Sequence, residues 1–133
     1  MKVFLDTNGV VSAVATRGLC ADLLHLILAE HELVLGETVF TELRLVLRRK
    51  IGLSTETIEE LEEFLRREAR VVTATTVVPA RALDAADVAV LAEAATAAAN
   101  VLVTGDHDLL GVADPPVEVL SPRGLWEKLR GMA

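Results

Sequence analysis

The sequence has no tyrosine, a single cysteine and very few aromatic residues. Aromatic side chains make up 3% of its 133 residues, too few for the stacking platforms on which single-strand-binding modules hold bases. Because Cys20 is the only cysteine, an internal disulfide is impossible, and no Cys/His cluster has the spacing of a zinc site. These absences favour a reducing compartment, and we expect the protein in the cytoplasm.

Positive charge and long apolar runs are also scarce. A net charge of −7 argues against a protein that binds nucleic acid by bulk electrostatics, although acids gathered around divalent cations would weaken that argument. The most apolar stretch, residues 85–103, is interrupted by Asp87, Glu93 and Asn100, so no membrane segment is expected. Asp6 follows the first apolar residues too early for a signal peptide.

What the sequence does contain is apolar material for one core, at 52% hydrophobic and 25% charged residues. We expect a single domain over residues 1–133. Short apolar strands alternate with helices, a pattern typical of an α/β fold with a central, mainly parallel sheet. Strands are expected at 3–5, 33–35, 101–103 and 117–120, with another within 70–78 that ends at Pro79. Helices are expected after Asp6, over 19–30, from a cap at Thr38 to 47, over 54–67 and 82–99, briefly at 108–110 and from Pro122.

Two carboxylates follow directly on predicted strands. Asp6 comes after 3–5, and Asp106 comes after 101–103. In a parallel sheet the carboxyl ends of neighbouring strands share one edge, where ligands bind. Each aspartate taken alone is better explained as a helix N-cap, so a functional interpretation depends on the whole set of acids.

Two further acids lie on predicted helices. Asp87 stands in a helix with almost no polar face, and its carboxylate needs a partner if it is buried. In the structural alternative, Asp84 is the N-cap of this helix, and Asp87 lies in the first turn because the helix dipole favours an acid there. Glu42 lies at the edge of an apolar stripe and means little alone. Together, acids from four separate elements would form an all-oxygen site suited to Mg²⁺ or Mn²⁺. Phosphodiester hydrolysis is the chemistry that such a site favours.

The order and spacing of four segments resemble the PIN domain, especially the VapC-like toxin ribonucleases of prokaryotic toxin–antitoxin pairs. The resemblance extends over essentially the whole chain and implies a PIN-like three-layer α/β/α domain. The segments are Val3-Phe4-Leu5-Asp6-Thr7-Asn8, Glu42, residues 87–92 and Val103-Thr104-Gly105-Asp106-His107-Asp108-Leu109.

The resemblance also implies a site and an activity. It carries over Asp6, Glu42, Asp87 and Asp106 as catalytic and metal-binding acids, Asp108 as a further metal ligand, and Asn8 and Thr104 as supporting polar groups. The implied activity is that of a Mg²⁺- or Mn²⁺-dependent endoribonuclease acting on single-stranded or structured RNA. Such enzymes are often homodimers and are inhibited by a cognate antitoxin.

Two other functions remain open on the sequence. One is a catalytically silent PIN-like module that binds a partner through its leucine-rich helices, which retention of all four acids disfavours. The other is Mg²⁺-dependent phosphoryl transfer through an aspartyl phosphate, as in haloacid-dehalogenase-like phosphatases. This alternative is disfavoured because Asp6-Thr7-Asn8 lacks the second aspartate of the motif of those phosphatases. A basic run at Arg44, Arg48, Arg49 and Lys50 could contact RNA phosphates or form a solvated helix face.

Overall fold

A computed structural model describes residues 1–78 and 83–131 of the chain. At its centre lies a five-stranded sheet in the order β3-β2-β1-β4-β5, and every neighbouring pair of strands is parallel. The expected mainly parallel sheet is therefore confirmed. The strands are β1 (Lys2–Leu5), β2 (Glu32–Gly36), β3 (Arg70–Val72), β4 (Val101–Val103) and β5 (Glu118–Leu120).

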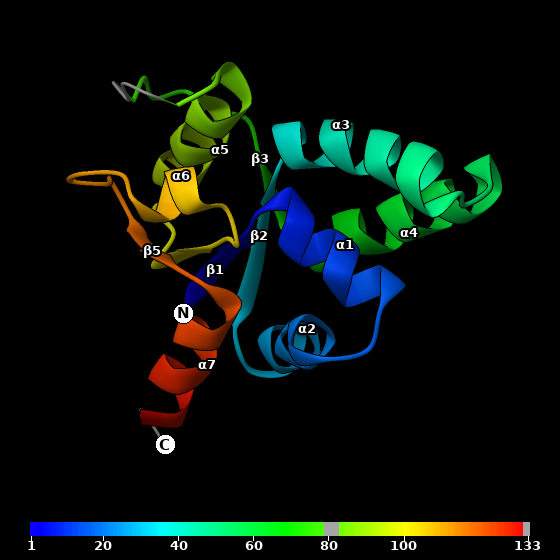
Figure 1. Ribbon diagram of the computed structural model, residues 1–133, viewed down its shortest axis with the longest axis horizontal. Helices are drawn as coiled ribbons and strands as arrows, with labels where there is room; N and C mark the ends of the chain where they lie inside the picture. The colour runs from blue at the N-terminus through cyan, green and yellow to red at the C-terminus, as the bar shows by residue number, and fades with distance from the viewer. Residues whose placement is uncertain (79–82, 132–133) are drawn as a thin grey trace.

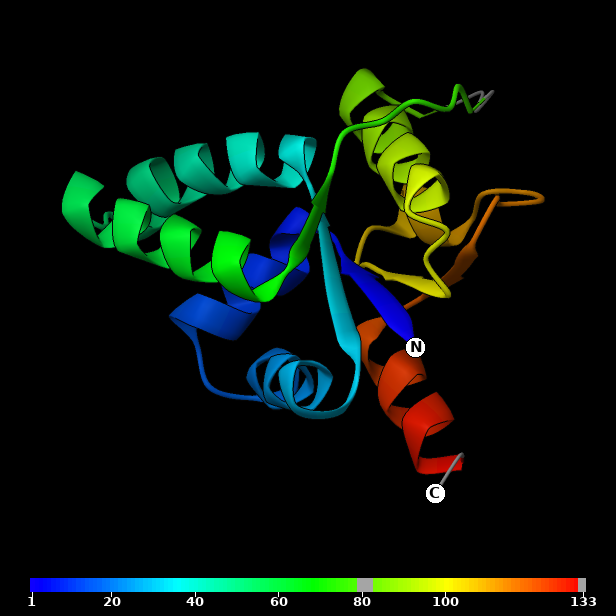
Figure 2. The ribbon, with the colours of Figure 1, turned by 180° about the vertical axis from the view of Figure 1, so that it is seen from behind.

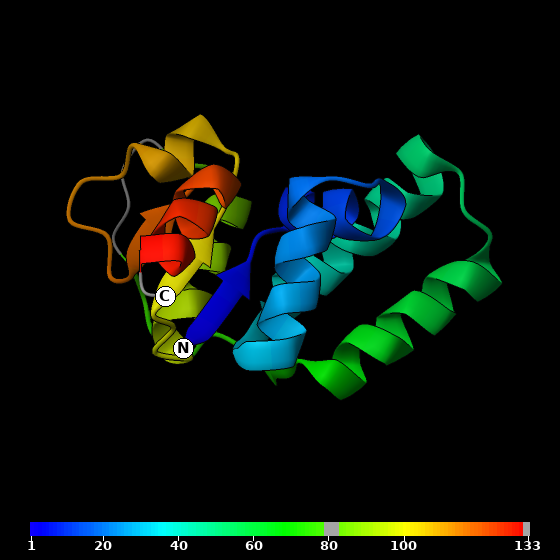
Figure 3. The same ribbon diagram turned by 90° about the horizontal axis from the view of Figure 1, so that it is seen from below.

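Helices cover both faces of this sheet, which gives the three-layer α/β/α arrangement. α1, α2 and α3 lie on one side and α5 on the other (Figures 1 and 2). α3 and α4 extend beyond the sheet as a helical hairpin, seen from below in Figure 3. The helices are α1 (Thr7–Ala15), α2 (Leu19–Glu30), α3 (Glu37–Val46), the π-helical turn η1 (Leu47–Ile51), α4 (Thr55–Glu68), α5 (Ala85–Thr96), α6 (His107–Leu110) and α7 (Pro122–Gly131).

After a charged first residue in β1 and in β2, the central strands are apolar and buried, because helices cover both faces of the sheet. Many strand residues are fully buried, among them Val3, Phe4, Leu35 and Leu102. A strand covered on both faces loses the polar–apolar alternation of a half-exposed strand. This is why short apolar runs predicted these strands correctly.

Some predicted boundaries were wrong. The last strand begins at Glu118, one residue later than expected, whereas β3 lies within the expected 70–78; the stop expected at Pro79 falls outside the described residues. The helix expected over 82–99 is shorter, since α5 ends at Thr96 and Ala98 adopts a left-handed φ of 52°. The chain must turn there to enter β4, so tertiary geometry overrides the helix propensity of alanine.

The start of α3 is a second correction. Thr38 was expected to cap this helix, but the N-cap is Gly36 and α3 begins at Glu37. β2 leads into α3 without an intervening loop, so Thr38 already lies within the first turn. The cap must therefore come from elsewhere in the molecule.

Polar and apolar contacts dock α4 against α3. Arg66 donates to both carboxylate oxygens of Glu37, at 2.8 and 2.9 Å, and its guanidinium lies 4.1 Å from the centroid of the Phe40 ring. Leu65, on the same helix, is fully buried. Because exposed ion pairs contribute little, apolar burial is the main contribution to this docking.

Within the described residues, no single helix is long and apolar enough to cross a bilayer, and α1 and α2 reach that length only as a pair bent by 99°.

Replacing Leu65 with alanine should destabilise the fold by about 2–5 kcal/mol, since it deletes a fully buried side chain. Leu45→Ala is the matched control, because Leu45 is 46% exposed and should cost less than about 0.5 kcal/mol. Urea unfolding followed by circular dichroism measures both. Equal losses in the two variants would show that α4 is not anchored through Leu65.

Candidate metal centre

The candidate site lies where β1 and β4 run side by side. Leu5 pairs with Val103, and the backbone N–H of Asp6 donates to the carbonyl of Val103 at 3.0 Å. From β1 the chain proceeds to β2 on one side, and it later returns to β4 on the other. This reversal is the topological switch point, where the carboxyl ends of parallel strands form a crevice.

Asp6 is the most buried acid of the site, with 7% exposure. Its Oδ1 accepts from the backbone N–H of Thr7 at 2.7 Å, and its Oδ2 accepts from Oγ1 of Thr104 at 2.8 Å. Burial raises the pKa of Asp6, the two hydrogen bonds lower it, and the charges of Asp106 and Asp84 raise it, with a net increase. Without a cation, the buried carboxylate is held by hydrogen bonds that only partly offset its desolvation.

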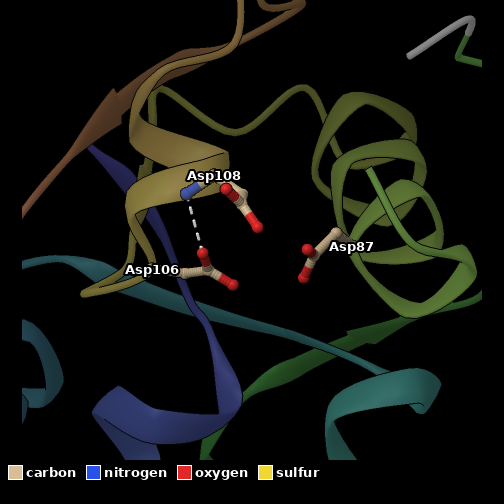
Figure 4. A group of neighbouring side chains, drawn as sticks. All are labelled: Asp87, Asp106 and Asp108. Carbon is tan, nitrogen blue, oxygen red and sulfur yellow. Dashed lines mark hydrogen bonds between the residues drawn. The ribbon is translucent and has the colours of Figure 1, made fainter. Parts of the chain in front are cut away.

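Three more acids meet beside Asp6. One carboxylate oxygen from each of Asp87, Asp106 and Asp108 lies within 4.8 Å of the others, and Figure 4 shows Asp87 on α5 facing the two aspartates at the start of α6. Oδ1 of Asp106 accepts from the backbone N–H of Asp108 at 2.8 Å. The backbone N–H of Asp106 donates to Oγ1 of Thr104 at 3.0 Å. Thr104 therefore links Asp6 and Asp106 directly.

Glu42 reaches the site through a threonine. Its Oε1 accepts from Oγ1 of Thr7 at 3.1 Å, and the backbone of Thr7 is bonded to Asp6. Burial raises the pKa of Glu42, the hydrogen bond from Thr7 lowers it, and the negative charges of Asp6 and Asp84 raise it, with a net increase. The half-buried glutamate thus belongs to the same electrostatic group as the aspartates.

Asp87 is the acid on which burial and the repulsion between neighbouring carboxylates act most strongly. Burial, followed by the charges of Asp106, Asp84, Asp6 and Asp108, raises its pKa to about 6. All four charged neighbours are negative. A bound divalent cation would reverse this effect, because it favours the ionised form of every carboxylate around it.

Sequence reasoning undervalued Asp84 and Thr7. Asp84 was considered only as a helix cap, and it does accept from the backbone N–H of Asp87 at 2.8 Å. Its charge also raises the pKa of Asp6, Glu42 and Asp87. The spacing of three residues between Asp84 and Asp87 could have indicated that the two carboxylates lie close together, since an N-cap side chain folds back over the first helical turn. Nothing in the sequence indicated the bond between Thr7 and Glu42.

Among the described residues, the remaining polar side chains of the predicted segments and of the basic run form no hydrogen bond with these acids. Asn8 and His107 are exposed, and no side-chain hydrogen bond of Asn8 is found within residues 1–78 and 83–131. Arg44 forms a bidentate pair with Glu62 on α4. Arg48, Arg49 and Lys50 are exposed on η1, beyond the end of α3.

The donor set fits a hard cation. All its side chains offer carboxylate oxygens, supported by two threonine hydroxyls, and no histidine or cysteine takes part among the described residues. Oxygen-only sites suit Mg²⁺ and Mn²⁺, whereas zinc favours nitrogen and sulfur ligands. The acids that can contribute are Asp6, Glu42, Asp87, Asp106 and Asp108.

Comparison with known proteins gives a consistent result. A family model described as PIN domain matches residues 2–108. No curated protein matches the chain in sequence.

Three solved structures share this fold at 16–17% sequence identity. VapBC2 from Rickettsia felis, bound to a DNA fragment from its promoter, has a TM-score of 0.65 at 16% identity, covering 91% of this chain and 98% of that one. VapBC-1 from nontypeable Haemophilus influenzae has a TM-score of 0.64 at 16% identity, covering 92% and 99%. FitAcB from Neisseria gonorrhoeae has a TM-score of 0.59 at 17% identity, covering 91% and 98%.

In the absence of metal, Asp87→Asn should stabilise the protein at pH 7 and do so less at pH 5. The pKa of Asp87 is about 6 in the folded state and 3.8 as the usual value, so the folded protein binds the extra proton between these values. Stability attributable to this group therefore rises as pH falls from about 6 towards 4. Urea unfolding in EDTA at both pH values measures the difference.

A variant that is less stable than the wild type at pH 7, or a difference that does not change with pH, would contradict this account of Asp87.

Proposed function

This chain belongs to the PIN domain family, and on that premise we propose that it is a Mg²⁺- or Mn²⁺-dependent endoribonuclease. It hydrolyses phosphodiester bonds in single-stranded or loop regions of RNA. The observation that carries the proposal is the convergence of Asp87, Asp106 and Asp108 beside the buried Asp6. Acids that raise one another's pKa are costly to a fold unless they bind a cation.

Asp6, Glu42, Asp87, Asp106 and Asp108 would hold the metal. A divalent cation bound there would lower the pKa of an attacking water and offset the charge of the phosphate. It would also give a protein of net charge −7 a local positive region for RNA.

The chain's own hydroxyls orient these acids. Thr104 donates to Oδ2 of Asp6 at 2.8 Å, and Thr7 donates to Oε1 of Glu42 at 3.1 Å. Each bond fixes one oxygen and so directs the remaining lone pairs of the carboxylate. A site held in advance loses less free energy when its ligand binds.

The biological setting is part of the same proposal. Similar solved structures are the VapBC complexes, which supports a role as the toxin of a toxin–antitoxin pair with a protein antitoxin. We further propose that the enzyme acts in the cytoplasm, as a homodimer.

Asp6→Asn should abolish RNA cleavage while the protein stays folded. Asparagine keeps an oxygen acceptor for Thr7 or Thr104 but removes the charge that a cation requires. We expect a loss of about 100-fold or more, the scale seen when one key charge-stabilising group is removed. The assay is cleavage of single-stranded and hairpin RNAs with Mn²⁺ or Mg²⁺, and Asp22→Asn, an exposed aspartate on α2, is the matched control.

Cleavage that needs both the metal and Asp6 supports the nuclease. Cleavage that persists in EDTA or in Asp6→Asn would contradict it. Metal binding by calorimetry without cleavage of any RNA in the panel would direct the search to another substrate, and neither binding nor cleavage would favour the silent binding module.

Mn²⁺ affinity should fall steeply when the pH is lowered from 7.5 to 5. Asp87, with a pKa of about 6, must lose its proton to bind a cation, and the raised pKa values of Asp6 and Glu42 act in the same direction. Binding should therefore release protons. Calorimetry in two buffers with different ionisation enthalpies measures that release, and an affinity that is the same at both pH values would refute the assignment of these ligands.

A further inference from the structure

Glu93 is a buried acid that the metal centre does not use. It lies on α5, the helix that carries Asp87, and is 3% exposed. Its Oε2 accepts from the backbone N–H of Thr38 at 3.0 Å, while within the described residues its Oε1 has no hydrogen-bond partner. Burial raises the pKa of Glu93. Because burying such a group is costly, its position needs a compensating role.

The contact lies at the start of α3, where a cap is missing. The N-cap residue is Gly36, which has no side chain to accept from the first backbone N–H groups of the helix. Those groups require partners, and the positive end of the helix dipole favours a carboxylate. Glu93 supplies a carboxylate acceptor for one of these groups, the N–H of Thr38, from a different helix.

Gly36 provides the space for this contact. A Cβ atom at residue 36 would lie 2.2, 2.4 and 2.9 Å from Oε1, Cδ and Oε2 of Glu93. The φ of Gly36 is −101°, a value open to any residue, so its backbone conformation does not require glycine. The absence of a side chain at residue 36 and the carboxylate of Glu93 are therefore complementary.

Glu42 lies one helical turn after Thr38, the residue whose amide Glu93 accepts from. Thr38 and Glu42 are four residues apart on α3, so their side chains lie on the same face, one turn apart. A hydrogen bond to the amide of Thr38 restrains the rotation and the axial position of α3. Glu42 then meets Oγ1 of Thr7 at 3.1 Å.

We propose that Glu93 is a positioning residue that caps α3 from α5 and thereby sets Glu42 against Thr7 and the aspartates. The consequence for metal binding rests on the proposed function, whereas the cap itself does not. One contact thus couples the helix that carries Glu42 to the helix that carries Asp87.

Glu93→Gln and Glu93→Ala form the matched pair that tests this role. Both remove the charge, but only alanine removes the acceptor for Thr38. We expect Mn²⁺ affinity within about twofold of the wild type for glutamine and at least about fivefold weaker for alanine, the scale of losing one helix cap. Equal losses in the two variants would show that Glu93 acts only through its charge and would overturn the proposal, as would no loss in either.

Moving the cap to residue 36 provides an independent test. Gly36→Ser should lower the urea midpoint in the wild type, where its Cβ meets Glu93, and raise it in the Glu93→Ala background, where serine can cap α3 itself. This reversal of sign is specific to a shared capping site. The same sign in both backgrounds would overturn the proposal.

A readout without metal separates this proposal from the nuclease assignment. Hydrogen exchange at the Thr38 amide should be slow in the wild type and in Glu93→Gln and faster in Glu93→Ala, and crystal structures should show the Thr7–Glu42 bond in the first two only. If the wild type binds no Mn²⁺, the proposed function fails while these results still decide the cap. A protected Thr38 amide and an intact Thr7–Glu42 bond in Glu93→Ala would refute the role of Glu93.

Discussion

β1 and β4 pair in parallel at the centre of the sheet, with Leu5 opposite Val103. This pairing places Asp6 and Thr104 next to each other at the carboxyl edge of the sheet, where the hydroxyl of Thr104 donates to Asp6 and accepts from the amide of Asp106. α5 and α3 then add Asp87 and Glu42 from opposite faces (Figure 1). Because all these groups are acids, the fold concentrates negative charge at one point, and that charge must be offset.

Helix capping and site formation use the same residues. Asp6, Asp84 and Asp106 each accept a backbone N–H at the start of α1, α5 and α6 respectively. The structural and functional interpretations of these aspartates are therefore compatible. A capping carboxylate has one oxygen engaged by the helix and further lone pairs available to a cation. Helices that begin at the carboxyl edge of the sheet thus direct their acids to one place.

The sheet and the helical hairpin contribute in different ways. Buried strands hold Asp6 and Thr104 rigidly, since their neighbours are close-packed on both faces. α3 enters the site as one arm of a hairpin that extends past the sheet (Figure 3), so the placement of Glu42 depends on contacts near its first turn. Glu93 at Thr38 and Thr7 at Glu42 are those contacts.

The amino-acid sequence was enough to predict the α/β class, the order of strands and helices, and the proximity of Asp6 and Asp106. These follow from local patterns: apolar runs, helical periodicity and acids directly after strands. Three contacts became visible only in the folded structure: Thr7 meets Glu42 across 35 residues, Thr104 meets Asp6 across 98, and Glu93 accepts from the amide of Thr38 across 55. The reason is physical, because a hydrogen bond between distant residues depends on how whole helices pack, and no short-range pattern records that packing.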